Sequence, residues 1–165
     1  MKTYDIIILC ANVVITLVSF WGARKSLKYY KKSKNLTSHA NLNKALLEIE
    51  KMQKKVPEAL SALAQKRRNP RGCNPPKAIS SLGEELSTSL IEIHSCIPSE
   101  YTVKFSDLEK TNIFNLQRFI NECISEKPII VENNFEKDCI YCQERLNAMQ
   151  EFLKDQIDKV GEKLK

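Results

Sequence analysis

Six cysteines and two histidines are the residues of this 165-residue chain best suited to bind a metal or attack a substrate. Cys139 and Cys142 have the spacing of half a zinc site, which normally needs a second pair of ligands. No second pair occurs, and Cys73, Cys96 and Cys123 are isolated. Cys139 and Cys142 also fall on the apolar stripe of a predicted helix, where reduced cysteine packs as a small hydrophobe. We therefore expect core positions, and neither a metal nor a cofactor.

The histidines do not form a recognisable catalytic group either. Di-metal sites in helical bundles place a glutamate three residues before a histidine, but the residues three before His39 and His94 are Leu36 and Ile91. The four glycines are scattered, which excludes a glycine-rich phosphate loop. The sequence thus predicts a protein that is not an enzyme and has no small-molecule substrate.

Charge is divided unevenly along the chain, whose formal net charge is +6. Residues 24–34 contribute six bases and no acid, and residues 66–77 contribute five bases and no acid. Residues 78–165 carry sixteen acids against ten bases. A nucleic-acid-binding surface is not expected from this distribution, since the distal half would repel phosphates.

The basic residues at 24–34 directly follow an apolar run, residues 6–23, which is interrupted only by Asn12, Thr16 and Ser19. A helix of this length reaches about 30 Å, the thickness of a bilayer's hydrocarbon core. Tyr4 and Trp21 suit the two interfaces. The run therefore predicts a transmembrane helix that is retained as a signal anchor, because the residues before Gly22 and Ala23 do not fit a signal-peptidase site. Asn12 is either a tolerated polar residue or a contact that favours homo-oligomers.

The excess of lysine and arginine after this segment sets its predicted orientation. Basic flanks remain in the cytoplasm, so we expect a single-pass protein with its N-terminus outside and its C-terminal domain cytoplasmic. The glycosylation pattern at Asn35-Leu36-Thr37 would require the opposite orientation, but the charge bias outweighs this short pattern. A juxtamembrane cluster of this kind attracts anionic lipids. The predicted lipid-contact residues are Arg24, Lys25, Lys28, Tyr29, Tyr30, Lys31, Lys32 and Lys34.

Beyond the basic segment, apolar residues recur every three or four positions, as in packed helices. The pattern predicts helices over 42–63, with a kink or break near Lys55 caused by Pro57, and over 81–97, 106–123 and 134–160. Ser81–Glu84 and Ser106–Glu109 have the spacing of capping boxes. Residues 67–77, rich in proline and arginine, predict a basic connecting loop. Its Arg67, Arg68 and Arg71 are the candidate partner contacts.

The expected architecture is all-α: a transmembrane anchor at 1–23, a polybasic juxtamembrane linker at 24–38 and a domain at 39–165. That domain is expected to be an antiparallel bundle of about four helices, with an elongated oligomeric coiled coil as the alternative. The predicted function is that of a membrane-tethered interaction or regulatory module that recruits or scaffolds a protein partner. The alternative is a membrane-active effector whose transmembrane helix oligomerises under control of the helical domain.

Overall fold

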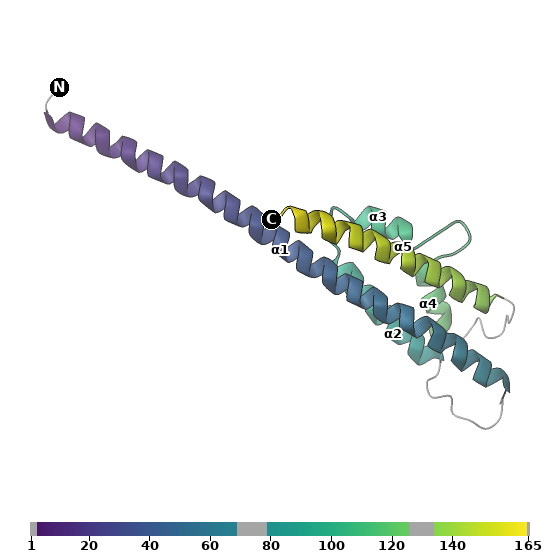
Figure 1. Ribbon diagram of the computed structural model, residues 1–165. Coiled ribbons are helices and arrows are strands. Elements are labelled where there is room, and N and C mark those ends of the chain that lie inside the picture. The colour runs from purple at the N-terminus through teal and green to yellow at the C-terminus, as the bar shows by residue number, and fades with distance from the viewer. Residues whose placement is uncertain (1–2, 69–78, 126–133, 165) are drawn as a thin grey trace.

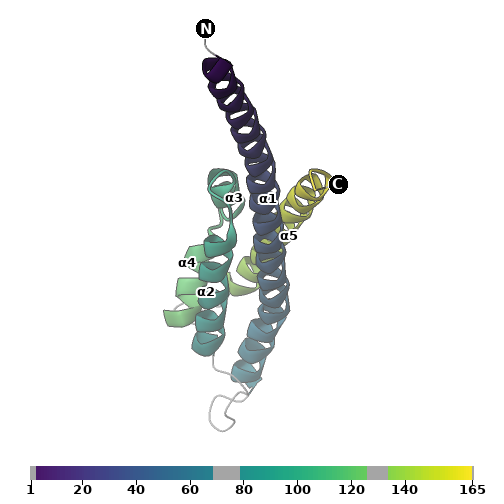
Figure 2. The ribbon, with the colours of Figure 1, turned by 90° about the vertical axis from the view of Figure 1, so that its left-hand side faces the viewer.

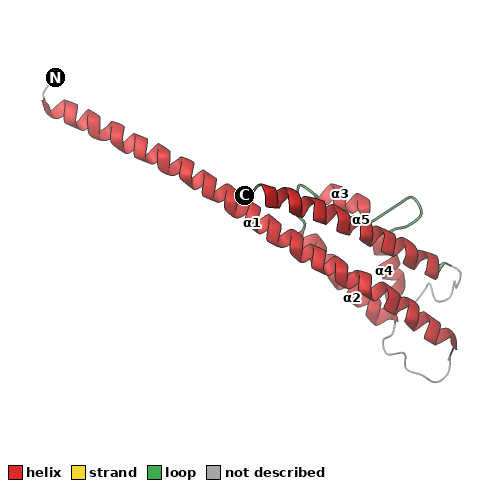
Figure 3. Ribbon diagram, viewed as in Figure 1, coloured by secondary structure: helices red, strands yellow, loops and turns green. Residues whose placement is uncertain are grey.

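The computed structural model describes residues 3–68, 79–125 and 134–164; the side chains of residues 3–11, 63 and 65–68 lie outside this description. All its regular elements are helices, and the described residues contain no strand beyond one isolated bridge between Lys110 and Asn115 (Figure 3). The helices are α1 (Thr3–Arg68), α2 (Ile79–Cys96), α3 (Thr102–Leu108), α4 (Leu116–Ser125) and α5 (Phe135–Glu162). The predicted all-helical fold is confirmed.

The molecule has two parts, both built on α1 (Figure 1). The C-terminal half of α1 packs with the other four helices, and we call this assembly the bundle. The N-terminal half projects from it as a single helix, and all of its side chains from Asn12 to Lys34 are exposed. We call residues 12–34 the arm. From Asn12 onward, the first buried residue of α1 is Leu42, close to the predicted start of the helical domain.

Helices α2 and α5 lie on different sides of α1 and both run antiparallel to it (Figure 2). Contacts that join α1 to α2 include those of Lys44 with Glu92, Glu48 with Ser89, and Lys55 with Glu85. The residue numbers rise along α1 while they fall along α2, so the two helices run in opposite directions. The contacts of α5 show the same order: His39 lies opposite Gly161, Glu50 bonds Gln150, and Gln53 bonds Asn147. The antiparallel bundle expected from the sequence is therefore formed within one chain.

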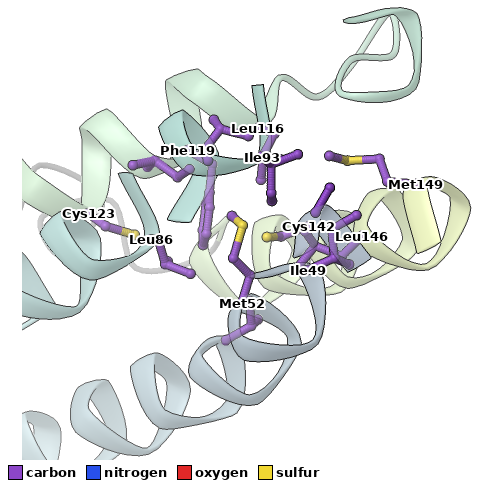
Figure 4. Packing of buried hydrophobic residues seen from close by; sticks show 14 of the residues in the cluster. Ile49, Met52, Leu86, Ile93, Leu116, Phe119, Cys123, Cys142, Leu146 and Met149 are labelled. Carbon is purple, nitrogen blue, oxygen red and sulfur yellow. The ribbon is translucent and has the colours of Figure 1, made fainter. Parts of the chain in front are cut away.

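The core is a continuous apolar cluster to which all five helices contribute. Figure 4 shows how its residues from α1, α2, α4 and α5 pack together. The apolar stripes predicted for α1, α2 and α5 supply most of it, and those predictions are confirmed. The largest side chains with at most 1% exposure include Phe105 of α3 and Phe135 of α5. Burial of such side chains stabilises the fold by roughly 1.5–3 kcal/mol each. Residues predicted for these stripes and found buried include Leu42, Ile49, Met52, Leu86, Leu90, Ile93, Cys142, Leu146, Met149 and Leu153.

Of the predicted kink or break near Lys55, the break is wrong, because α1 continues through Pro57 to Arg68. A proline lacks the amide N–H that would bond the carbonyl four residues earlier, here that of Gln53. In the bundle the side chain of Gln143, on α5, donates a hydrogen bond to the Gln53 carbonyl oxygen at 3.3 Å. Pro57 itself is exposed, while its neighbour Val56 is buried. A partner from another helix thus replaces the missing backbone bond.

The single helix expected over 106–123 is also wrong, since the segment forms α3 and α4 with a tight turn between them. Helix α3 begins at Thr102, so Ser106 and Glu109 do not form a capping box. In the turn, the Thr111 amide donates to the Phe114 carbonyl at 2.6 Å, and the Phe114 amide donates to Thr111 Oγ1 at 3.0 Å.

The ends of the other helices differ slightly from expectation. Asn115 caps α4, because its Oδ1 accepts a hydrogen bond from the Arg118 amide at 3.0 Å. Helix α2 already includes Ile79, so the expected cap at Ser81 lies inside it. Helix α2 ends at Cys96, and Ile97, expected on this helix, is buried just beyond its end.

Among the described residues, none of the helices combines the length and the apolar character needed to cross a bilayer. The predicted span at 6–23 is therefore not confirmed as a membrane segment. Its first part, residues 6–11, lies outside the residues whose side chains are described.

Candidate membrane-contact surface

The arm carries large apolar side chains that nothing else in the described molecule covers. Its valine, isoleucine, leucine, phenylalanine and tryptophan side chains between Val13 and Trp21 are 52–66% exposed. At about 100° per residue they spread around most of the helix, leaving a narrow strip for Asn12, Thr16 and Ser19. An amphipathic surface helix would instead confine its apolar residues to one face. Residues 13–21 therefore have an apolar surface around most of the helix, with no partner among the described residues.

The polar side chain of Thr16 is satisfied within the arm itself. Its hydroxyl donates a hydrogen bond to the carbonyl oxygen of Asn12 at 2.8 Å, one helical turn back. A hydroxyl bonded in this way needs no water. Thr16 thus adds little to the cost of placing this helix in an apolar medium.

Basic and aromatic side chains meet where the apolar part of the arm ends. The Arg24 guanidinium carbon lies 5.3 Å from the centroid of the Phe20 ring, and Lys25 Nζ lies 5.0 Å from that of Trp21. Both distances are within cation–π range. Side chains with an apolar body and a charged end are suited to a boundary between apolar and aqueous surroundings.

Six basic and aromatic residues of the arm share one face of α1, which we call the cation–aromatic face. Their spacing of three and four residues matches the helical repeat. The face is formed by Trp21, Arg24, Lys25, Lys28, Tyr29 and Lys32. Of the other predicted lipid-contact residues, all exposed on α1, Tyr30 and Lys34 lie away from this face, whereas Lys31 lies at its edge, about 20° around the helix from Arg24. The eight predicted lipid-contact residues therefore do not all lie on one face of α1.

The predicted partner contacts at the other end of α1 are only partly described. Arg67 and Arg68 belong to the last turn of α1, but their side chains lie outside the described residues, as does the whole of Arg71. The basic loop at 67–77 to which they were assigned therefore remains a prediction beyond Arg68.

The seam between α1 and α2 contains the buried carboxylate of Glu48, which the sequence analysis did not single out. Glu48 is only 5% exposed. Its Oε1 lies 2.5 Å from Lys51 Nζ, and its Oε2 accepts a hydrogen bond from the Ser89 hydroxyl at 3.2 Å. Lys55 pairs with Glu85 at 2.6 Å on the same seam. These contacts fix how α2 packs on α1 and leave no free catalytic carboxylate at Glu48.

A small pocket of about 280 Å³ lies beside the turn between α3 and α4. Its wall includes Arg118, Glu122 and Asp138, and Arg118 Nε bonds Glu122 Oε1 at 2.8 Å. Burial, followed by the nearby Glu122 charge, raises the pKa of Asp138. Arg118 and Glu122 of α4 pair with each other, Asp138 of α5 faces them, and this set of side chains points to no particular ligand.

Cys139 and Cys142 are buried, as expected for core residues. Cys139 and Cys142 are 1% and 0% exposed. Burial raises the pKa of the Cys123 thiol to about 12 and also raises those of Cys139 and Cys142. Since the thiolate is the form that binds metals and attacks substrates, these thiols are poorly suited to either role. Across residues 3–68, 79–125 and 134–164, no His, Cys, Asp and Glu side chains cluster in a group of three or more that could hold a metal ion.

Comparisons with protein-family models, with curated proteins and with solved structures give no match for this chain.

Proposed function

We propose that the chain is a single-pass membrane protein whose α1 anchors the bundle at the cytoplasmic face, where the bundle recruits or regulates a protein partner. The observation that carries the proposal is the all-round exposure of the apolar arm between Val13 and Trp21. Leaving that surface in water costs roughly 25 cal/mol per Å². A bilayer removes the cost without requiring a complementary protein groove.

The bundle supports the second half of the proposal because it is complete without the arm. Its apolar cluster begins at Leu42 and closes through α2 to α5. The arm contributes no residue to this cluster. We therefore assign the arm a role other than stabilising the bundle. In this proposal the bundle is an interaction module and not an enzyme.

The charge at the end of the apolar segment supports the proposed orientation. The bases from Arg24 to Lys34 are exposed on α1, and positively charged flanks favour the cytoplasmic side. Because α1 is unbroken, the bundle follows on that same side.

Membrane anchoring is tested by introducing charge into the arm of the full-length protein. We expect the wild-type protein to remain in the membrane pellet after alkaline carbonate extraction, and the double variant Val14→Glu/Val18→Glu to be released. Each carboxylate at the centre of a span opposes insertion by about 2.5–3.5 kcal/mol. The matched control is Ile91→Glu, an equally exposed apolar position of α2, which should stay in the pellet. Extraction of the wild-type protein into the soluble fraction would refute the anchor.

Recruitment is tested by replacing residues 6–23 with an unrelated transmembrane helix and comparing cross-linked partners of both proteins. A tether tolerates the exchange, so the same partner should be recovered with both. Loss of the partner and of cellular function on exchange would instead favour the effector alternative, in which the span is the active element.

A further inference from the structure

The cation–aromatic face has no counter-charge within the described part of the chain. The arm contains no acidic residue, and among the described residues no ion pair joins a carboxylate to the four bases of this face. Trp21 and Tyr29 frame the bases and are 66% and 62% exposed. Four free cations flanked by two exposed aromatic rings form a surface complementary to anionic groups at an apolar boundary.

The face continues the line along which α5 packs on α1. From Trp21 the steps of three and four residues pass through Lys25, Lys28 and Lys32 and arrive at His39, which lies opposite Gly161 near the end of α5. Helix α5 ends at Glu162. Among the described residues no other helix lies along this face, and Figure 1 shows α5 beside only the C-terminal half of α1.

The positions of the bases along the helix indicate how α1 is inclined to the membrane. Lys32 lies about 16 Å along the axis from Trp21, whereas the headgroup layer on one side is only about 5–8 Å thick. If α1 stood perpendicular to the membrane, with Trp21 at the interface, Lys28 and Lys32 would lie beyond the headgroups. Inclining α1 toward the cation–aromatic face brings both bases down to the phosphates.

From this geometry we propose that the cation–aromatic face binds the phosphate groups of anionic lipids, with α1 inclined toward the membrane on that side. The inference rests on the proposed anchoring and adds to it a ligand class, a binding face and a direction of tilt. It differs from general attraction of a basic segment, because Lys28 and Lys32 lie at the centre of the face, whereas Lys31 lies at its edge and Lys34 beyond it.

The test uses Trp21, the only tryptophan of the chain, as a reporter in the full-length protein. The protein is reconstituted into phosphatidylcholine vesicles containing the same fraction of either brominated phosphatidylcholine or brominated phosphatidylserine. Each base at the surface gives roughly a fivefold preference for anionic lipid. We expect brominated phosphatidylserine to quench Trp21 fluorescence more strongly than brominated phosphatidylcholine.

Two double variants that lose the same charge distinguish binding by the cation–aromatic face from general attraction by the basic segment. Lys28→Gln/Lys32→Gln should abolish the excess quenching by brominated phosphatidylserine, and Lys31→Gln/Lys34→Gln should retain most of it. Equal quenching of the wild-type protein by the two lipids, or equal loss in the two variants, would overturn the inference while leaving the anchor intact. Absence of quenching by either lipid would show that Trp21 is not at a membrane, which refutes the proposed anchoring as well.

Discussion

The arm and the bundle portion of α1 belong to one unbroken helix but have opposite surroundings. Between Leu42 and Ala59 every third or fourth residue is buried to 2% exposure or less. Between Val13 and Trp21, side chains that are at least as apolar remain more than half exposed. Apolar residues confined to a stripe need one helical neighbour, whereas apolar residues around the whole circumference need a surrounding medium. The distribution of apolar residues around α1, more than their number, separates its two environments.

The largest expected effect comes from a core aromatic residue. Phe105, the one buried residue of the short α3, is 0% exposed and packs against Phe152, with ring centroids 6.4 Å apart. Phe105→Ala should lower the free energy of unfolding of the bundle by about 3–5 kcal/mol. Phe20→Ala in the arm is the matched control and should leave it unchanged. Thermal unfolding of the full-length variants in mild detergent measures both, and a similar loss in the two would contradict the division of α1.

Two glycines allow a smaller, sterically defined comparison. A Cβ on Gly83 would lie 2.8 Å from the backbone nitrogen of Ile124, whereas one on Gly22 would have no atom within 4 Å. Gly83→Ala must push α2 and α4 apart and should cost about 1–3 kcal/mol. Gly22→Ala should leave the bundle unaffected and favour the helical arm by up to about 1 kcal/mol. Urea unfolding followed by circular dichroism tests both, and an unchanged midpoint for Gly83→Ala would show that α2 and α4 are not in contact.

The smallest expected effect is a pH dependence confined to the bundle. Burial raises the pKa of Glu109, although His94, whose Nε2 lies 2.7 Å from Glu109 Oε1, opposes the shift. An acid with a raised pKa in the folded state binds more protons there than in the unfolded state. Stability should therefore fall as pH rises from the unfolded pKa, near 4.3, to the folded pKa.

Glu109→Gln removes this dependence. As the pH rises from 4 to 7, the urea midpoint of the wild-type protein should fall relative to that of the variant. A difference that stays constant over this range would show that the pKa of Glu109 is the same in the folded and unfolded states.

Much of the fold could be predicted from the sequence because apolar spacing directly encodes which side of a helix is buried. The stripes of α2 and α5, including Cys139 and Cys142, follow from their steps of three and four. Continuity through Pro57 could not be predicted in this way, since the donor that rescues the Gln53 carbonyl is Gln143, far away in the sequence. The turn after α3 depends on the hydroxyl of Thr111, a local bond that competes with helix continuation.

The candidate site was predictable in composition but not in arrangement. The basic residues after the apolar run are evident from their density, whereas the distance of each from the cation–aromatic face depends on helical phase. Applying the 100° step to Trp21, Lys25, Lys28 and Lys32 would have revealed the shared face. What no spacing could supply is the position of α5 along α1, where Gly161 lies opposite His39.

Hydrogen–deuterium exchange of the full-length protein in lipid nanodiscs tests the central claim most directly, because it reports on both parts of α1 at once. We predict that amides of residues 12–23 exchange very slowly, and that this protection persists in the Phe105→Ala variant although the amides of α2 lose theirs. An isolated helix in water frays and exchanges rapidly. Rapid exchange of residues 12–23 in nanodiscs would contradict the account.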